Sequence, residues 1–411
     1  MSRSTLAMLT FPALFAVSIL VGRASRLEEG EVSLVWPATA VAIIWMLVVW
    51  HCTRRERFLH LGMLAAVTFA MHVLTRSPMA NSAWFGLVNI VLVLVTVGIL
   101  HYRRDVAVLR DPTDLARLVL AILAGSVCGA TLATAYVVLV AGAPAWETFA
   151  LITARNAASA LVGVSAWLRL CDVRWGWPRC SVRDYAEALA TTVVVVGVFV
   201  WVFWLNTGSP IAFLVILPSV YVTLRYTTTV ATVFLAAASG WIIFATLSGK
   251  GTLRVSDPQF QALVAQGWVV SLTVAVLALA LYRDVRVHLI AELEAARDLF
   301  SGVLQAASEQ AIIATDPSGH VTVFNRGAER LLGWTAAEAL GHSVLEFHYP
   351  SELRARAEEL GVPVNFGLVT GNVFPDAAET REWTFVRRDG SHVEVSLAVS
   401  QMTDHRGACL G

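Results

Sequence analysis

The sequence predicts a mostly α-helical, polytopic membrane bundle of about eight to ten spans, followed by a small α+β domain. Apolar stretches follow one another from Thr5 to Leu281, and the composition becomes charged from Tyr282 onward. Beyond Glu309, short β-type runs alternate with turn residues. We therefore expect a membrane domain over residues 1–285, a coiled-coil-like helical linker over 286–306 and a small domain over 307–411.

Each apolar stretch is long enough, or nearly so, to cross a hydrocarbon core of roughly 30 Å as a helix. The formal net charge of zero conceals an excess of arginine in the membrane part and of acid in the remainder. The predicted spans are residues 5–22, 32–51, 58–75, 83–101, 116–140, 147–168, 186–206, 210–226, 228–248 and 262–282.

Loop arginines predict the orientation, because short cytoplasmic loops retain positive charge. On one side lie Arg54, Arg55, Arg57, Arg103, Arg104, Arg110, Arg169, Arg174, Arg179, Arg183, Arg283 and Arg286. On the other lie Arg23, Arg26, Arg76, Lys250 and Arg254, together with the acids Glu28, Glu29 and Glu31. We expect both termini to be cytoplasmic. The first stretch is also compatible with a secretory signal, but its length and the span that follows favour an uncleaved helix.

A few polar residues interrupt the predicted spans. Arg155 and Asn156 lie in the middle of the sixth span, where a charge costs at least about 2.5 kcal/mol and must face protein, a ligand or water. They are our candidate ligand contacts in the membrane, and helix-helix hydrogen bonding with Asn89 or His72 is the structural alternative. Trp36-Pro37 and Pro218 are expected to kink the second and eighth spans.

Several short motifs together resemble one family of bacterial receptors. They are Val35-Trp36-Pro37-Ala38-Thr39-Ala40, Arg103-Arg104, Leu217-Pro218 with Leu224-Arg225-Tyr226, and Gly249-Lys250-Gly251-Thr252. Their order is similar to that of the first membrane-associated sensor (MASE) family. The resemblance covers most of residues 5–285, and it implies an input module in the bacterial inner membrane that passes a stimulus to the cytoplasm.

The linker carries apolar residues at alternating spacings of four and three. They are Leu289, Leu293, Ala296, Phe300 and Val303. This spacing is typical of a coiled-coil seam, and two such helices would form a homodimer. An amphipathic helix packed on the next domain is the alternative. We take these residues as the candidate signal relay, because rotation of a helix can transmit a membrane event.

Two hairpins are predicted in the small domain. Ala311–Thr315 and Val321–Phe324 flank the turn Asp316–Gly319, and Asn325 is placed to cap the helix that follows. Later, Arg381–Arg388 and Ser391–Ser400 flank a two-residue Asp389-Gly390 turn.

This order resembles the PAS sensory fold. The residues that carry the likeness are Thr315-Asp316, Gly319, Asn325 with Ala328, Gly333-Trp334, Gly341 and Arg388-Asp389-Gly390. The resemblance implies a five-stranded antiparallel sheet with helices on one face. We expect the last strand to be missing, because the sequence ends at Gly411.

No cofactor, metal site or catalytic group is predicted, and the ligand of the small domain is unknown. The cysteines lack both Cys-x-x-Cys spacing and the context of a flavin photosensor, and His342 and His348 lie in settings unlike those of haem ligands. Asn325 and Trp334 are the candidate ligand contacts of this domain, with a purely structural role as the alternative.

The function predicted is a membrane receptor that perceives a small-molecule stimulus and relays it through the PAS domain. By resemblance, a diguanylate cyclase, with or without a phosphodiesterase, or a two-component histidine kinase would follow as the output. Its partners would be the lipid bilayer and a second copy of the chain, and no nucleic acid. The alternatives are a transporter with a regulatory tail and an adaptor that pairs with a longer receptor.

Overall fold

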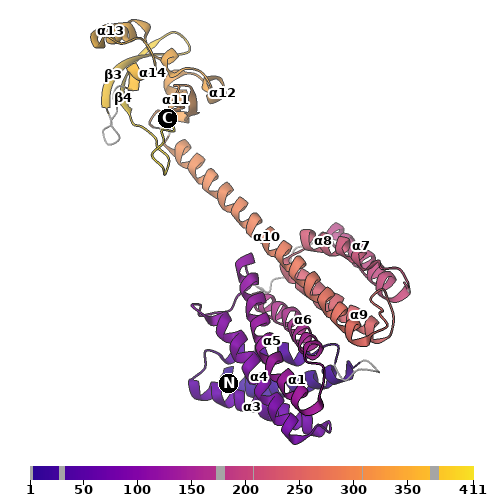
Figure 1. The fold of residues 1–411 in the computed structure, drawn as a ribbon. Coiled ribbons are helices and arrows are strands. Elements are labelled where there is room, and N and C mark those ends of the chain that lie inside the picture. The colour runs from indigo at the N-terminus through magenta and orange to yellow at the C-terminus, as the bar shows by residue number, and fades with distance from the viewer. Residues whose placement is uncertain (1–2, 27–32, 173–180, 207, 308, 371–378) are drawn as a thin grey trace. The chain divides into compact units, whose positions relative to one another are not determined.

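The computed structural model describes residues 3–26, 33–172, 181–206, 208–307, 309–370 and 379–411. It forms two compact units, Met1–His288 and Leu289–Gly411, coloured in sequence order in Figure 1. Glu28, Glu29, Glu31, Arg174 and Arg179, which were used above to predict the orientation, lie outside the described residues.

The regular elements in the described part of the first unit are helices. Its helices are α1 (Arg3–Ala24), α2 (Pro37–Val49), α3 (Arg54–Leu74), α4 (Met79–His101), α5 (Pro112–Ala141), α6 (Ala145–Cys171), α7 (Val182–Val200) with the π-turn η1 (Trp201–Leu205), the 3₁₀ turn η2 (Ala212–Val215), α8 (Ile216–Arg225), α9 (Thr228–Leu247) and α10 (Pro258–Ala306).

Within the described ranges, eight helices are long and apolar enough to cross a membrane, which agrees with the multi-pass membrane protein predicted. The remaining two predicted spans are the shorter apolar helices Pro37–Val49 and Ala212–Arg225. The kink expected at Pro37 is wrong. Pro37 is the first residue of α2, where its missing N–H and fixed φ suit a helix start. Pro218 lies in the first turn of α8, directly after η2.

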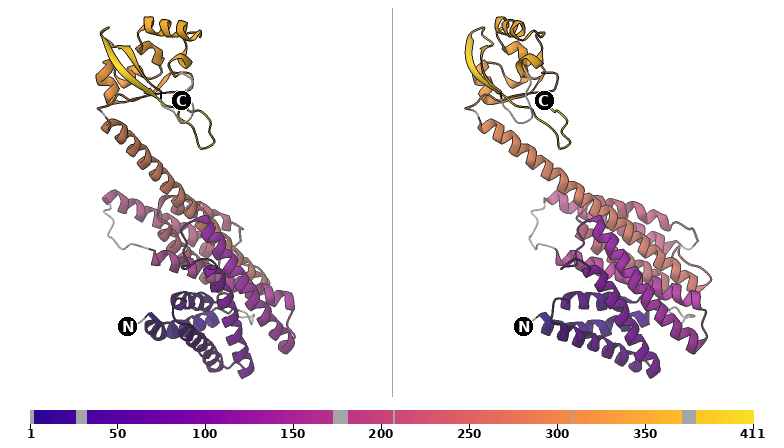
Figure 2. Two further views of the ribbon diagram at one scale, coloured as in Figure 1. Left: turned by 90° about the vertical axis from the view of Figure 1, so that its left-hand side faces the viewer. Right: turned by 60° about the vertical axis from the view of Figure 1, so that its left-hand side comes forward.

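Helices α1 to α6 pack in a bundle. α1 contacts α2 and α3, α4 lies between α3 and α5, and α6 contacts α2, α5 and α9. Small residues bring α2 and α6 close together, because a side chain at Gly163 would meet Cβ of Ala40 at 2.5 Å. Helices α7, α8 and α9 lie beside the first part of α10 (Figures 1 and 2).

The second unit contains two antiparallel hairpins and several short helices. Its elements are β1 (Ile313–Thr315), β2 (Val321–Phe324), α11 (Arg326–Leu332), α12 (Ala336–Ala339), η3 (Val344–Phe347), α13 (Pro350–Leu360), α14 (Phe366–Thr370), β3 (Glu379–Val386) and β4 (His392–Val399). β1 pairs with β2, and β3 pairs with β4. Both predicted hairpins are confirmed.

Two details of this unit differ from the prediction. Among the described residues the strands form two separate two-stranded sheets, and the expected five-stranded sheet is not seen. Isolated bridges, such as His348 to Phe385, join the remaining segments. The second turn is also longer than two residues. Arg387 donates its N–H to the Ser391 carbonyl (2.9 Å), and Gly390 supplies the positive φ of 80° that this turn needs.

Candidate functional site

The membrane candidate site lies where α6 passes the start of α2. Arg155, on α6, places its guanidinium carbon 4.8 Å from the centroid of the Trp36 ring. Its Nε is buried and has no hydrogen-bond partner in the part of the chain that the structure describes. A guanidinium over an indole face is attracted by the ring quadrupole, more strongly where water is excluded. This contact stabilises the positive charge of Arg155. It leaves the N–H groups of the guanidinium able to donate hydrogen bonds to another group.

The non-helical backbone before α2 places Trp36 beside Arg155. The 13 residues of α2 rise about 20 Å, which is less than the hydrocarbon core of roughly 30 Å. The non-helical residues Ser33–Trp36 therefore continue the path of the chain, and Leu34 among them is fully buried. Irregular backbone at membrane depth is tolerated only where protein or a water-filled cavity satisfies it.

The side chains of Ser159 and Ser25 bond backbone groups of this irregular segment. The Trp36 N–H donates to Ser159 Oγ of α6 (3.0 Å), and Ser25 Oγ donates to the Val35 carbonyl (3.1 Å). Gly22 of α1 leaves room for the indole, because a Cβ at Gly22 would lie 2.5 Å from the Trp36 ring. The position of the ring above Arg155 is thus fixed from both sides.

Asn156 has a different role from that of its neighbour. Its Oδ1 accepts a hydrogen bond from Thr39 Oγ1 of α2 (3.2 Å), and its side chain is buried. This contact corresponds to the structural alternative of the prediction, a hydrogen bond between helices. Asn89 bonds Thr68 rather than Asn156. Arg155 and His72 both lie beside Trp36, whose ring centroid is 6.5 Å from that of the imidazole.

The charges around this site are all positive among the described residues. Arg26 acts electrostatically on Arg155, and Arg23, Arg26 and Arg155 all act on His72. Arg23 is held in place by Ser77 Oγ (2.9 Å) and the Thr75 carbonyl (3.4 Å). In the part of the chain that the structure describes, no carboxylate forms a salt bridge with Arg155. The site therefore presents a positive field without a described counter-ion.

The same segment is bonded to α10. Gln266, which is fully buried, donates from Nε2 to the Leu34 carbonyl (2.9 Å). Its Oε1 is buried without a partner. The helix that leads out of the membrane unit thus contacts the backbone two residues before Trp36.

A second set of polar contacts surrounds α10 near the end of this unit. The Arg283 guanidinium donates to the carbonyls of Thr223 and Tyr226. Asp284 accepts from Thr228 Oγ1 (2.6 Å) and lies 3.6 Å from a guanidinium nitrogen of Arg169. These groups, which we call the Arg283–Asp284 clamp, connect α10 to the end of α8, the start of α9 and the end of α6.

The predicted relay residues lie on the exposed last part of α10. Leu289, Leu293, Phe300 and Val303 are 58–72% exposed, and Ala296 is exposed as well. Large apolar residues at coiled-coil spacing on an otherwise charged helix form an unpaired seam. The helix is continuous from Pro258 to Ala306.

Asn325 satisfies all its hydrogen-bonding capacity within the second unit. Its Oδ1 accepts from the N–H groups of Ala328 (2.9 Å) and Ile312 (2.8 Å). Its Nδ2 donates to the carbonyls of Ala307 (3.1 Å) and Gln310 (2.9 Å). The cap of α11 predicted at Asn325 is confirmed. The same side chain also binds the residues that directly follow α10, which points to a structural junction rather than to a ligand contact.

Trp334 lies against the core of this unit. Its ring is 5.9 Å from Phe347, and the Arg388 guanidinium lies 5.9 Å from its centroid. Its Nε1 is buried without a partner. The role predicted for Trp334 as a ligand contact stays a prediction.

His348 is the most strongly perturbed histidine of the second unit. It is buried against Trp383 and Phe385, with centroids at 5.1 and 4.5 Å, and its Nδ1 lies 3.0 Å from the Val344 carbonyl. Burial lowers its pKa to about 4, although the Val344 carbonyl and Glu352 oppose this shift. His348 is therefore neutral at pH 7. His342, in contrast, is exposed beside Glu346.

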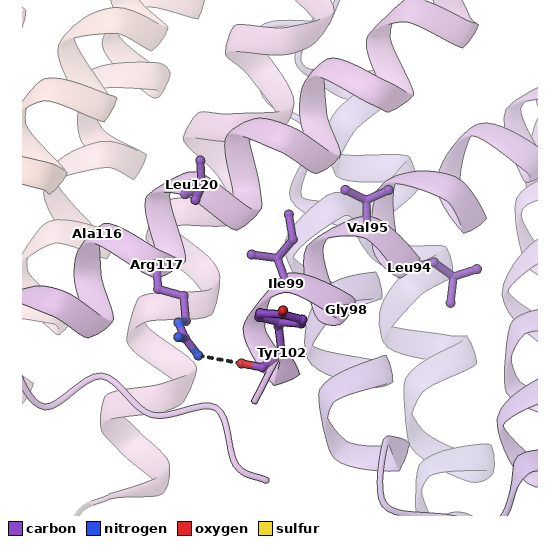
Figure 3. Close-up of a pocket in the computed structure, with 8 residues that line it drawn as sticks. All are labelled: Leu94, Val95, Gly98, Ile99, Tyr102, Ala116, Arg117 and Leu120. Atoms are coloured by element: carbon purple, nitrogen blue, oxygen red, sulfur yellow. Dashed lines mark hydrogen bonds between the residues drawn. The ribbon is translucent and has the colours of Figure 1, made fainter. Parts of the chain in front are cut away.

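Two pockets of the first unit lie apart from these groups. One of about 640 Å³ lies between α4 and α5, where Arg117 donates to the Tyr102 carbonyl (3.0 Å), as Figure 3 shows. Several of its lining residues, including Tyr102 and Leu120, are more than half exposed. The other, of about 620 Å³, is an apolar groove between α7, α8 and α9. Neither contains converging charged groups, so we place the candidate site at Arg155.

The sequence analysis missed the residues of α10 that bind it to the other helices of the membrane unit. Gln266 interrupts an apolar span just as Arg155 does, and the same rule for buried polar groups points to it. Arg283 was used only to predict the orientation, and no role was predicted for Asp284. Their partners lie about 55–115 residues away in the sequence, and no local pattern reveals such pairs.

Searches of curated proteins and of solved structures find no match to this chain. The family comparison does give a match, and it falls in the second unit. Residues 299–411 match the PAS fold, so this part of the chain is supported as a PAS domain, a module that indicates a signalling or sensory role.

Proposed function

We propose that this chain is the input part of a membrane receptor, in which the membrane unit perceives a stimulus and α10 carries it to the PAS domain. The observation that carries the proposal is the bonding of α10. Gln266 binds the Leu34–Trp36 segment at the candidate site, and the same helix continues to Ala306, next to the PAS junction at Asn325.

The stimulus is proposed to act at Arg155 and Trp36. A ligand that moves Trp36 also moves the Leu34 carbonyl, and Gln266 transmits this displacement to α10. The Arg283–Asp284 clamp is the pivot at the other end of the span. Such a shift or rotation of a packed helix is a known class of switching motion, and both contacts belong to the same unit.

The sequence motifs listed above support assignment of the membrane unit to the MASE family. That assignment implies that the protein lies in the bacterial inner membrane. The loop arginines imply that both termini are cytoplasmic. We further propose a homodimer, in which the seam formed by Leu289, Leu293, Ala296, Phe300 and Val303 pairs with its copy. The output would be a diguanylate cyclase or phosphodiesterase, or a two-component histidine kinase.

The relay is tested by changing the phase of the seam. In a fusion of residues 1–411 to a histidine-kinase catalytic core, deletion of two residues from the segment 290–299 rotates all later residues by about 200°. We expect kinase output to become fixed high or low, because the seam and the catalytic core are then out of phase. Deletion of seven residues preserves a repeat of about 3.5 residues per turn and serves as the matched control.

Cysteine cross-linking gives a readout that needs no output domain. Leu293→Cys should form an intermolecular disulfide in native membranes, and Glu294→Cys should do so much more slowly. Equal rates for the two variants, together with equal output from the two deletions, would refute the relay.

A further inference from the structure

The candidate site at Arg155 has a chemistry that narrows the class of ligand. Arg155 is a planar, permanently charged donor with five N–H groups, and its Nε is buried without an acceptor among the described residues. Burial of a guanidinium donor without an acceptor is unfavourable by about 1–3 kcal/mol or more. The Trp36 ring face interacts with the cation, but it supplies no lone pair in the plane of the guanidinium.

The surroundings of Arg155 favour an anion over a neutral ligand. Arg26 acts on Arg155 as a like charge, and Arg23 and Arg26 add to the positive field at neighbouring His72. Like charges in a poorly solvated region repel, and a bound anion relieves this repulsion. A neutral ligand would leave it unchanged.

The geometry also favours a planar or tetrahedral oxyanion. Guanidinium groups bind carboxylates and phosphates through paired N–H donors, and these bonds are among the strongest hydrogen bonds in proteins. The contact with Trp36 holds the guanidinium carbon 4.8 Å from the ring centroid, so the N–H groups that do not face the ring remain for a ligand. The backbone N–H of Trp36 donates to Ser159 Oγ, and Asn156 Oδ1 accepts from Thr39 Oγ1. Arg155 carries the charged donors at this site, so it is the residue that would hold the ligand.

We propose that Arg155, held against Trp36, binds the carboxylate or phosphate group of an anionic ligand. This inference rests on the proposed receptor function and names its ligand class. Two sources share this chemistry, a soluble anion and the headgroup of an anionic phospholipid.

The test uses the full chain in phosphatidylcholine nanodiscs, titrated with inorganic phosphate and with succinate. We expect saturable binding by calorimetry of at least one of the two anions. Arg155→Gln should weaken binding roughly tenfold to a hundredfold, the range expected for a hydrogen bond to a charged group. Arg155→Lys should recover part of the lost affinity, because lysine restores the positive charge but not the planar, paired N–H donors of the guanidinium. Arg117→Gln, in the same helical bundle but outside the site, should bind like the wild type.

A second arm distinguishes the lipid source. If the anion is a headgroup, nanodiscs that contain phosphatidylglycerol should raise the melting temperature of the wild type more than that of Arg155→Gln, and the soluble anions should show no binding. Equal behaviour of the wild type and Arg155→Gln in both arms would overturn the proposal.

Chemical protection avoids dependence on a variant that fails to fold. Phenylglyoxal modifies accessible arginines, and mass spectrometry locates the modified positions in the wild type. Phosphate, succinate or phosphatidylglycerol should slow modification at Arg155 relative to Arg117, and equal rates with and without these anions would count against the site. A negative result here with normal Leu293→Cys cross-linking would reject the ligand class and leave the receptor function standing.

Discussion

Gln266 of α10 donates a hydrogen bond to the carbonyl of Leu34, across 232 positions of sequence. Both residues are fully buried. The bond joins the irregular segment that precedes α2 to the helix that leaves the membrane unit. It connects the segment that contains Trp36 to the helix that continues into the linker.

Replacement of Gln266 should weaken this connection. Gln266→Leu leaves the buried Leu34 carbonyl without its donor, at a cost of about 1–3 kcal/mol. We expect a lower melting temperature of the full chain in nanodiscs and a changed rate of Leu293→Cys cross-linking. Gln259→Leu, at an exposed position of the same helix, is the control. Cross-linking rates unchanged by Gln266→Leu would show that this bond does not influence the linker.

Asp284 should set the position of α10 at the other end of the span. Asp284→Asn removes the charge that faces Arg169 and Arg283, and bonds to charged groups contribute about 1.5–3 kcal/mol. We expect faster amide hydrogen exchange in residues 278–288, measured by mass spectrometry on the full chain. Asp298→Asn changes an exposed acid of the same helix and should have no effect there. Equal exchange in both variants would remove Asp284 from the clamp.

Asn325 offers a way to separate its two roles. Asn325→Asp keeps the acceptor that caps α11 and binds the Ile312 N–H, but it cannot donate to the Ala307 and Gln310 carbonyls. We expect faster hydrogen exchange at 309–313 with little change in α11. Asn325→Ala should increase exchange in both segments, since loss of an N-cap alone costs about 1 kcal/mol. Identical patterns for the two variants would contradict this division.

Acid should destabilise the PAS domain through His348. Its folded pKa of about 4 lies below the ordinary value of 6.5, so the unfolded chain binds the proton first as pH falls. The contribution of His348 to the free energy of unfolding is therefore complete above about pH 6.5. Up to about 3 kcal/mol of it is lost as the pH falls from about 6.5 to 4.

This dependence is measurable by urea pulse proteolysis of the full chain across that pH range. His348→Phe keeps an aromatic ring in contact with Trp383 and Phe385 and removes the titrating group. Its stability should fall less steeply with acid than that of the wild type. His405→Gln, at an exposed site, should follow the wild type. Parallel pH profiles for wild type and His348→Phe would exclude His348 as the cause.

The membrane helices, the hairpins and the cap at Asn325 could be predicted from the amino-acid sequence. These features depend on local physics: the length of apolar runs, the φ preference of glycine and the reach of an asparagine side chain over a few residues. The sequence also selected Arg155, because a charge in an apolar span is visible without any structure.

The partners of these residues could not be predicted and became visible in the folded chain. The stacking of Arg155 on Trp36, the bond from Gln266 to Leu34 and the Arg283–Asp284 clamp join helices distant in sequence. The same holds for Asn325, whose additional bonds to Ala307 and Gln310 place it at a junction. Composition and periodicity show which face of a helix is buried. The partner across an interface depends on how helices pack, and that is a property of the whole fold.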